Sequence, residues 1–259
     1  MEEAKELVLA RLHLRAVLPL LEEIVKNDEV LAKETKGWNG VLQFQLPGGE
    51  PATALIFDKG NLSVYKGDYP GRRKVTLTFK DAKTLNEVFQ GKSNKPPIPN
   101  VMALLHLKKL LKINNVMKRL EHYLQPEDHM LKDRAFFEEC VKMALYVMAF
   151  GVKEVGEHDP ELKVNSPYLP DGTLAINIIG GPSANITVIN GKFYPVKGMS
   201  RNPNAQLEIK DTDTAWDMIQ GKLDVFAATG RGDIKLKGFI AHIDGIKPLL
   251  DRLSFYLGS

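Results

Sequence analysis

The chain contains an internal repeat. The segment VTLTFKDAKTLNEVFQGK, residues 75–92, aligns without a gap with AQLEIKDTDTAWDMIQGK, residues 205–222, and seven of the eighteen positions are identical. The offset is 130 here, 132 near residue 42 and 133 near residue 119, and it changes at places rich in turn formers. Loop insertions in two copies of one fold produce such a drift. The repeat therefore predicts two domains, residues 1–125 and residues 126–259.

The composition of the chain limits its partners and its compartment. The 259 residues include 35 basic and 32 acidic side chains, so the net charge of +3 creates no single-sign field. We therefore expect no nucleic-acid partner, whereas transient contact with an anionic membrane surface stays open. Cys140 is the single cysteine, which excludes an intrachain disulfide and favours a reducing compartment. The acidic MEEAKE start is unlike a signal peptide, and the sequence predicts a cytoplasmic protein.

Each half combines helical and strand periodicity. Apolar residues at helical spacing predict a helix over residues 2–26 and a counterpart over residues 130–155. The period then becomes two, and four short strands follow, separated by turns such as residues 47–49 and residues 180–182. Short loops between successive strands predict a mainly antiparallel sheet, and its single apolar face predicts helices on one side.

The two copies differ after the next helix, which we expect to begin at an N-cap aspartate, Asp81 or Asp211. In the second half, residues 232–238 alternate as a fifth strand and helical spacing returns up to residue 257. In the first half, SNKPPIPN at residues 93–100 replaces the approach to that strand. We therefore expect the first copy to be degenerate after residue 92 and to lack its fifth strand. The predicted fold class is α+β, with about five strands in each sheet.

Motifs for catalysis and for metal binding do not occur in the sequence. Gly91-Lys92-Ser93 ends like a phosphate-binding loop, but Asn86 stands where the first glycine is required. The six histidines lack paired ligand spacing, Cys140 lies on an apolar helical stripe, and there is no Gly-x-Ser-x-Gly elbow. The sequence thus predicts no catalytic residue, no metal site, no cofactor and no enzymatic activity.

The order of the predicted elements resembles the sterol carrier protein 2 (SCP2) family of lipid-binding domains. The segments of the second half that follow the family order are Leu207-Glu208-Ile209, Asp211, Gly221-Lys222, Ala227-Ala228 and GDIKLKG at residues 232–238. The resemblance implies two tandem domains in which helices and sheet enclose an apolar tunnel. The implied ligand is a fatty acid, a sterol or another apolar small molecule, held by a lipid-binding or lipid-carrier protein.

We expect the tunnel in the second half, because prolines interrupt the strand region of the first half and the helical tail over residues 101–124 can fill its cavity. The expected wall residues are Trp216, Ile219, Phe226, Phe239, Ile240, Ile243 and Leu249. The alternative is that these residues form a closed core. The protein would then be a non-enzymatic interaction module, with the two copies packed as an intramolecular pseudo-dimer. The sequence leaves the ligand and the oligomeric state open.

Overall fold

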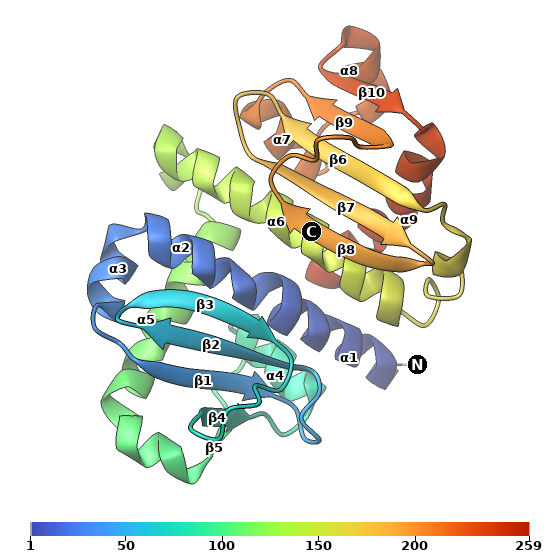
Figure 1. The fold of residues 1–259 in the computed structure, drawn as a ribbon. Helices are drawn as coiled ribbons and strands as arrows, with labels where there is room; N and C mark the ends of the chain where they lie inside the picture. The colour runs from blue at the N-terminus through green and yellow to red at the C-terminus, as the bar shows by residue number, and fades with distance from the viewer. Residues whose placement is uncertain (1, 259) are drawn as a thin grey trace. The chain divides into compact units, whose positions relative to one another are not determined.

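The computed structural model describes residues 2–258, apart from the side chains of residues 104, 105, 107–109, 111 and 167. The chain divides into two compact units, Met1–His122 and Tyr123–Ser259, while the predicted boundary lies at residues 125 and 126. Each unit combines one sheet with helices that cover one face of that sheet (Figure 1).

The first unit begins with helices and continues with its sheet. Its elements are α1 (Glu2–Leu12), the π-helix η1 (His13–Val17), the 3-10 helix η2 (Leu18–Leu20), α2 (Leu21–Asn27), α3 (Glu29–Thr35), β1 (Gly40–Gln45), β2 (Ala52–Asp58), β3 (Asn61–Lys66), β4 (Val75–Thr78), α4 (Ala82–Phe89), β5 (Ile98–Pro99), the 3-10 helix η3 (Val101–His106) and α5 (Leu107–Leu124). The helix predicted over residues 2–26 is therefore interrupted. Pro19 explains part of the break, because proline provides no backbone N–H for a regular helix.

The second unit repeats this order with one long first helix. Its elements are the 3-10 helix η4 (Met130–Lys132), α6 (Arg134–His158), the 3-10 helix η5 (Ser166–Tyr168), β6 (Gly172–Ile178), β7 (Ser183–Ile189), β8 (Lys192–Lys197), β9 (Ala205–Ile209), α7 (Thr212–Ile219), α8 (Val225–Arg231), β10 (Ile234–Gly238) and α9 (Ile240–Leu257). Cys140 lies on the buried face of α6, where burial raises the pKa of its thiol to about 12.

The two sheets have the same topology. The strand order is β3-β2-β1-β4-β5 in the first unit and, in the same direction, β8-β7-β6-β9-β10 in the second. The register also agrees, since Leu42 pairs with Val75 and its counterpart Leu174 pairs with Ala205. This agreement confirms the predicted α+β fold and the internal repeat. Alternate residues of the central strands, such as Leu42 and Phe44 of β1 and Leu55 and Phe57 of β2, are buried, as the period of two predicts.

One strand pair in each sheet is parallel, namely β1 with β4 and β6 with β9. All other pairs are antiparallel. A short loop predicts antiparallel pairing only for two strands that are neighbours both in the sequence and in the sheet. The fourth strand of each unit instead crosses to the free side of the first strand, which makes that pair parallel.

The predicted loss of the fifth strand in the first unit is wrong. Ile98 and Pro99 form β5 opposite Thr78 and Leu77 of β4, and the N–H of Asn100 donates to the Thr76 carbonyl at 3.0 Å. Proline is tolerated here because β5 is an edge strand, so its missing N–H is not needed by a further neighbour. The strand is shortened to two residues, compared with five in β10.

The aspartates that open α4 and α7 act as N-caps, as the sequence predicts. Asp81 Oδ1 accepts from the Thr84 N–H at 2.7 Å, and Asp211 Oδ1 accepts from the Thr214 N–H at 2.8 Å. Such a cap satisfies a backbone donor that has no partner within the helix. Both helices therefore begin at equivalent positions of the repeat.

A buried aspartate anchors the last long helix of each unit. Asp28, before α3, accepts from Nε of Arg119 on α5 at 2.5 Å. Asp159, at the end of α6, accepts from Nε of Arg252 at 2.8 Å and from the hydroxyl of Tyr256 at 2.6 Å. Burial alone would raise the pKa of Asp159, but the hydrogen bonds from Tyr256 and Arg252 outweigh it and hold that pKa below its ordinary value.

Candidate functional site

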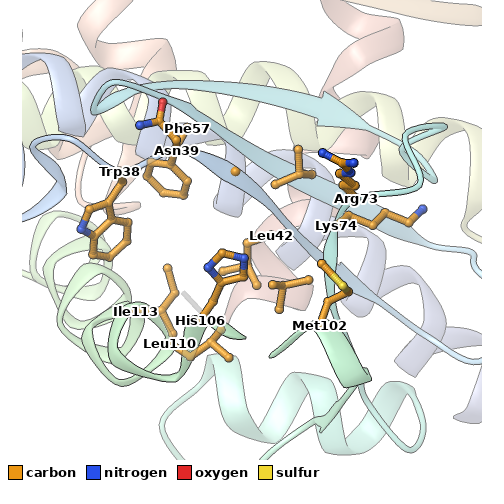
Figure 2. A pocket seen from close by; sticks show the side chains of 13 residues that line it. Trp38, Asn39, Leu42, Phe57, Arg73, Lys74, Met102, His106, Leu110 and Ile113 are labelled. Atoms are coloured by element: carbon orange, nitrogen blue, oxygen red, sulfur yellow. The ribbon is translucent and has the colours of Figure 1, made fainter. Parts of the chain in front are cut away.

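The candidate site is an apolar pocket in the first unit, between the helix-covered face of the sheet and the η3–α5 segment (Figure 2). Its volume is about 200 Å³. The sheet contributes Leu42 from β1, Phe57 from β2 and Val75 from the start of β4. These three side chains share a face because Leu42 pairs with both Leu55 and Val75, and Phe57 lies two residues beyond Leu55. The sheet thus provides a continuous apolar floor.

The opposite wall comes from helical residues that follow the fifth strand. Met102 and His106 lie on η3, and Leu110 and Ile113 lie on α5. Their spacing of four, four and three residues places them on one side of the helical segment. In Figure 2 their side chains point toward the same space as Leu42. The four described side chains therefore line the pocket. The expectation that residues 101–124 fill the first cavity also concerns the side chains of residues 104, 105 and 111, which lie outside the described part of the structure.

The two ends of the pocket differ in chemistry. Trp38 lies at one end and packs edge-on against Phe57, with ring centroids 5.1 Å apart. Arg73 and Lys74 lie at the other end (Figure 2). The ammonium of Lys74 pairs with Asp68 and donates to the Tyr69 carbonyl at 2.6 Å. The hydrogen bond from Lys74 holds the pKa of Asp68 below its ordinary value, so this carboxylate is ionised at neutral pH.

In the second unit, side chains lie close to the equivalent glycine of the first strand. Gly172 corresponds to Gly40, and a Cβ atom on Gly172 would collide with the His242 ring. The same Cβ would lie 2.9 Å from Cγ of Asn204, whereas a Cβ on Gly40 would meet nothing within 4 Å. His242, on α9, is only 2% exposed. This histidine occupies the space next to the first strand that is open in the first unit.

The structure distributes the seven predicted wall residues over different environments. Leu249 belongs to the core, Ile219 and Ile243 are half-buried, and Trp216 packs edge-on against Phe137 with ring centroids 5.8 Å apart. The remaining three are open to solvent, with exposed fractions of 90% for Phe226, 53% for Phe239 and 42% for Ile240. None of the seven lines the pocket of the first unit. A binding role for them stays a prediction.

A buried polar cluster in the first unit has no signal in the sequence. His13 Nδ1 lies 3.0 Å from Asn86 Oδ1, and Asn86 Nδ2 donates to the Glu6 carbonyl at 2.9 Å and to the Glu6 carboxylate at 2.6 Å. The His13 ring also stacks on Phe89. Burial lowers the pKa of His13 to about 4, against the smaller opposing effect of the Asn86 hydrogen bond. His13 is therefore neutral at physiological pH, in the π-helical turn that interrupts the first helix.

The described part of the chain shows neither a metal site nor a membrane span. Within residues 2–258, no group of three or more His, Cys, Asp or Glu side chains is placed to hold a metal ion. None of the described helices combines the length and the apolar character needed to cross a bilayer.

Comparison with known proteins identifies the first unit. Residues 21–98 match the model of the SCP-2 sterol transfer family. This match covers β1 to β4 and α4, and it ends at β5, just before the segment that forms the second wall of the pocket. Over these residues the first unit is similar to the SCP2 family, which supports the family resemblance drawn from the sequence, although the segments quoted for that resemblance lie in the second unit. The second unit shares its strand order and register. No match was found among curated proteins.

Solved structures of sterol carrier proteins are similar to parts of the chain. The sterol carrier protein domain 2 of Helicoverpa armigera is 20% identical with a TM-score of 0.35, over 43% of this chain and 89% of that one. Sterol carrier protein 2 from Yarrowia lipolytica, in its apo form, is 17% identical with a TM-score of 0.30, over 39% and 92%. Palmitated SCP2L2 from Aedes aegypti is 22% identical with a TM-score of 0.28, over 39% and 86%.

Proposed function

We propose that the protein binds an apolar small molecule, such as a fatty acid or a sterol, in the pocket of the first unit and acts as a lipid carrier without catalysis. The observation that supports this is the pocket itself, an apolar space between Leu42 and Phe57 on one side and Leu110 and Ile113 on the other. Ligand pockets are typically lined by apolar side chains with a few polar groups at defined places. The SCP-2 sterol transfer match over residues 21–98 supports the same class of ligand.

A simple estimate of the binding free energy is compatible with binding through apolar contacts alone. Each buried methylene contributes about 0.8 kcal/mol, so complete burial of a chain of about sixteen carbons would provide roughly 12 kcal/mol before costs, an upper bound for a ligand that enters only in part. Association costs about 4–15 kcal/mol, which leaves room for micromolar affinity without a covalent or metal anchor. The volume of about 200 Å³ is below the range of about 300–1,000 Å³ usual for drug-sized ligands. We therefore propose that one chain or ring enters and that the rest of the ligand lies at the open side.

The repeat provides a matched experiment. Leu110 lines the pocket, and Ile243, a predicted wall residue of the second unit, occupies the equivalent position 133 residues later. A fluorescent fatty acid is titrated against the full chain and against the variants Leu110→Phe and Ile243→Phe. We expect Leu110→Phe to weaken binding at least tenfold, because the larger ring occupies the pocket, and Ile243→Phe to leave the affinity unchanged.

Two outcomes would change this proposal. Binding that is lost only in Ile243→Phe would move the site to the second unit, as the sequence predicts. An unmodified chain that does not bind the probe would contradict the lipid-binding proposal. Thermal unfolding of both variants checks that each still folds.

A second candidate function is transient contact with a membrane surface. Phe226 on α8 and Phe239 before α9 are exposed apolar side chains that precede and follow β10 in the chain. On β10, Lys235 and Lys237 face solvent and both pair with Glu208, so these three side chains together carry one net positive charge. Exposed aromatic groups beside cations are suited to an anionic bilayer surface. We expect Phe226→Ser to reduce flotation of the protein with vesicles that contain phosphatidylserine. Tyr168→Ser is the control, since Tyr168 is 84% exposed elsewhere in the same unit. Equal flotation of both variants would contradict the contact.

A further inference from the structure

We propose that Arg73 selects ligands that carry an anionic head group, a carboxylate or a phosphate, at the mouth of the first-unit pocket. This inference rests on the proposed function, because it concerns the ligand of the same pocket. It assigns an orientation to that ligand: the anionic head lies at Arg73, and the apolar part runs along Leu42 and Phe57 toward Trp38.

The first support is the position and the state of Arg73. It belongs to the pocket lining, at the end opposite to Trp38 (Figure 2). Its side chain is exposed, and within the described residues it has no ion pair, hydrogen bond or aromatic contact. The adjacent Lys74 is different, because Asp68 neutralises its charge. Among the described residues that line this end of the pocket, the uncompensated positive charge is therefore that of Arg73.

The second support comes from the repeat. Val75 of β4 and Ala205 of β9 are equivalent by register, since each pairs with the equivalent residue of the first strand in its sheet. Two residues earlier, the first unit has Arg73 and the second has Pro203. The cation thus occurs in the unit whose pocket is open, and a proline stands at that position in the unit where His242 fills the space.

The third support is chemical. A guanidinium group stays charged at all physiological pH values and can hold a carboxylate or a phosphate by two parallel N–H···O bonds. An alcohol of the same chain length provides no charge and a single acceptor. Because Arg73 is exposed, water screens the pair, and we expect a selectivity of roughly threefold to tenfold rather than of several orders of magnitude.

The test compares three ligands with the same twelve-carbon chain: dodecanoate, dodecyl phosphate and dodecanol. Each competes with the fluorescent fatty acid for the Trp216→Phe variant, in which Trp38 in the pocket is the remaining tryptophan and the energy donor. We expect both anions to bind roughly threefold to tenfold more tightly than the alcohol, with an advantage that decreases as salt is added. Arg73→Gln should abolish this advantage. Arg72→Gln should retain it, because Arg72 is an exposed arginine next in the chain that does not line the pocket.

Each result has a distinct meaning. If none of the three ligands competes, the proposed lipid binding itself is contradicted. If dodecanol binds as tightly as both anions, the pocket binds lipids but the role of Arg73 is overturned. An advantage that persists in Arg73→Gln would also overturn it, since another group would then recognise the anion. A preference for one anion over the other shows whether a carboxylate or a phosphate is the better head group.

Discussion

The two units share a fold but differ in the space between their sheet and their last long helix. In the first unit this space is an apolar pocket next to Gly40, and Arg73 lines one end of it. In the second unit the equivalent space beside Gly172 is occupied by His242. Strand order and register are the same in both. The sheet therefore fixes where a pocket can form, and single side chains from the covering helices decide whether it is open.

A second difference lies under the short helix that follows the fourth strand. Asn86 on α4 and Trp216 on α7 are equivalent in the repeat. Asn86 holds buried His13 and the Glu6 carbonyl by hydrogen bonds, whereas Trp216 packs against the ring of Phe137. The same contact between first helix and short helix is polar in one unit and aromatic in the other. We expect the stability of the first unit to depend on pH at this contact.

The largest expected effect concerns the buried aspartates that the two units have in common. Asp28→Asn and Asp159→Asn each leave an arginine, Arg119 or Arg252, without its buried anionic partner. Breaking a buried pair by changing one partner costs about 3–5 kcal/mol. Each substitution should lower the free energy of unfolding of its own unit by about this amount, as measured by urea denaturation. A loss below about 1 kcal/mol, the range of surface pairs, would contradict the anchoring role.

A smaller effect is expected from His13, and it should appear only at acidic pH. The pKa of His13 is about 4 in the folded state, compared with 6.5 in an unfolded chain. Between these values the unfolded state binds more protons, so the His13 contribution to stability is complete above pH 6.5 and is lost as the pH falls toward 4. The shift corresponds to a loss on the order of 3 kcal/mol. The variant His13→Gln should lack this component of the pH dependence, measured by urea unfolding at pH 7, 5.5 and 4. If the free energy of unfolding depends on pH in the same way in the unmodified protein and in His13→Gln, the assignment of this effect to His13 is contradicted.

The smallest effect is a difference between two glycine substitutions. Gly40 and Gly172 both have positive φ angles, 130° and 150°, so alanine is strained at both positions. Only at Gly172 does the new Cβ also collide with His242. We expect Gly172→Ala to destabilise its unit by about 1–3 kcal/mol more than Gly40→Ala does, because overpacking adds to the strain. Equal losses in thermal unfolding would show that His242 does not fill the space beside Gly172.

The sequence predicted the fold well because the repeat provides each signal twice. The matching segments 75–92 and 205–222 located equivalent strands, and the two capping aspartates, Asp81 and Asp211, marked equivalent helix starts. The parallel pairing of the fourth strand was not predicted, because alternation shows which face is apolar but not which strand is the neighbour. The sequence does not predict the two-residue strand β5, because prolines disfavour a strand in general. Proline is compatible with β5 because this strand lies at the edge of the sheet.

The site was less predictable than the fold. Apolar residues such as Leu249 and Leu110 have the same helical spacing, but one belongs to a closed core and the other lines a pocket. This difference depends on how closely each helix approaches its sheet, which is decided by long-range contacts such as that of His242 with Gly172. The His13–Asn86 pair joins residues 73 positions apart in the chain, so no local pattern indicates it.

The buried cysteine provides an internal kinetic probe. Cys140 is the only thiol of the chain, it lies on α6 of the second unit, and its pKa is raised to about 12. A thiol reagent attacks through the thiolate of an accessible cysteine, so labelling in native buffer requires the helix around Cys140 to open. The rate of labelling therefore reports how often the second unit opens around α6, and a ligand that binds only in the first unit should leave that rate unchanged.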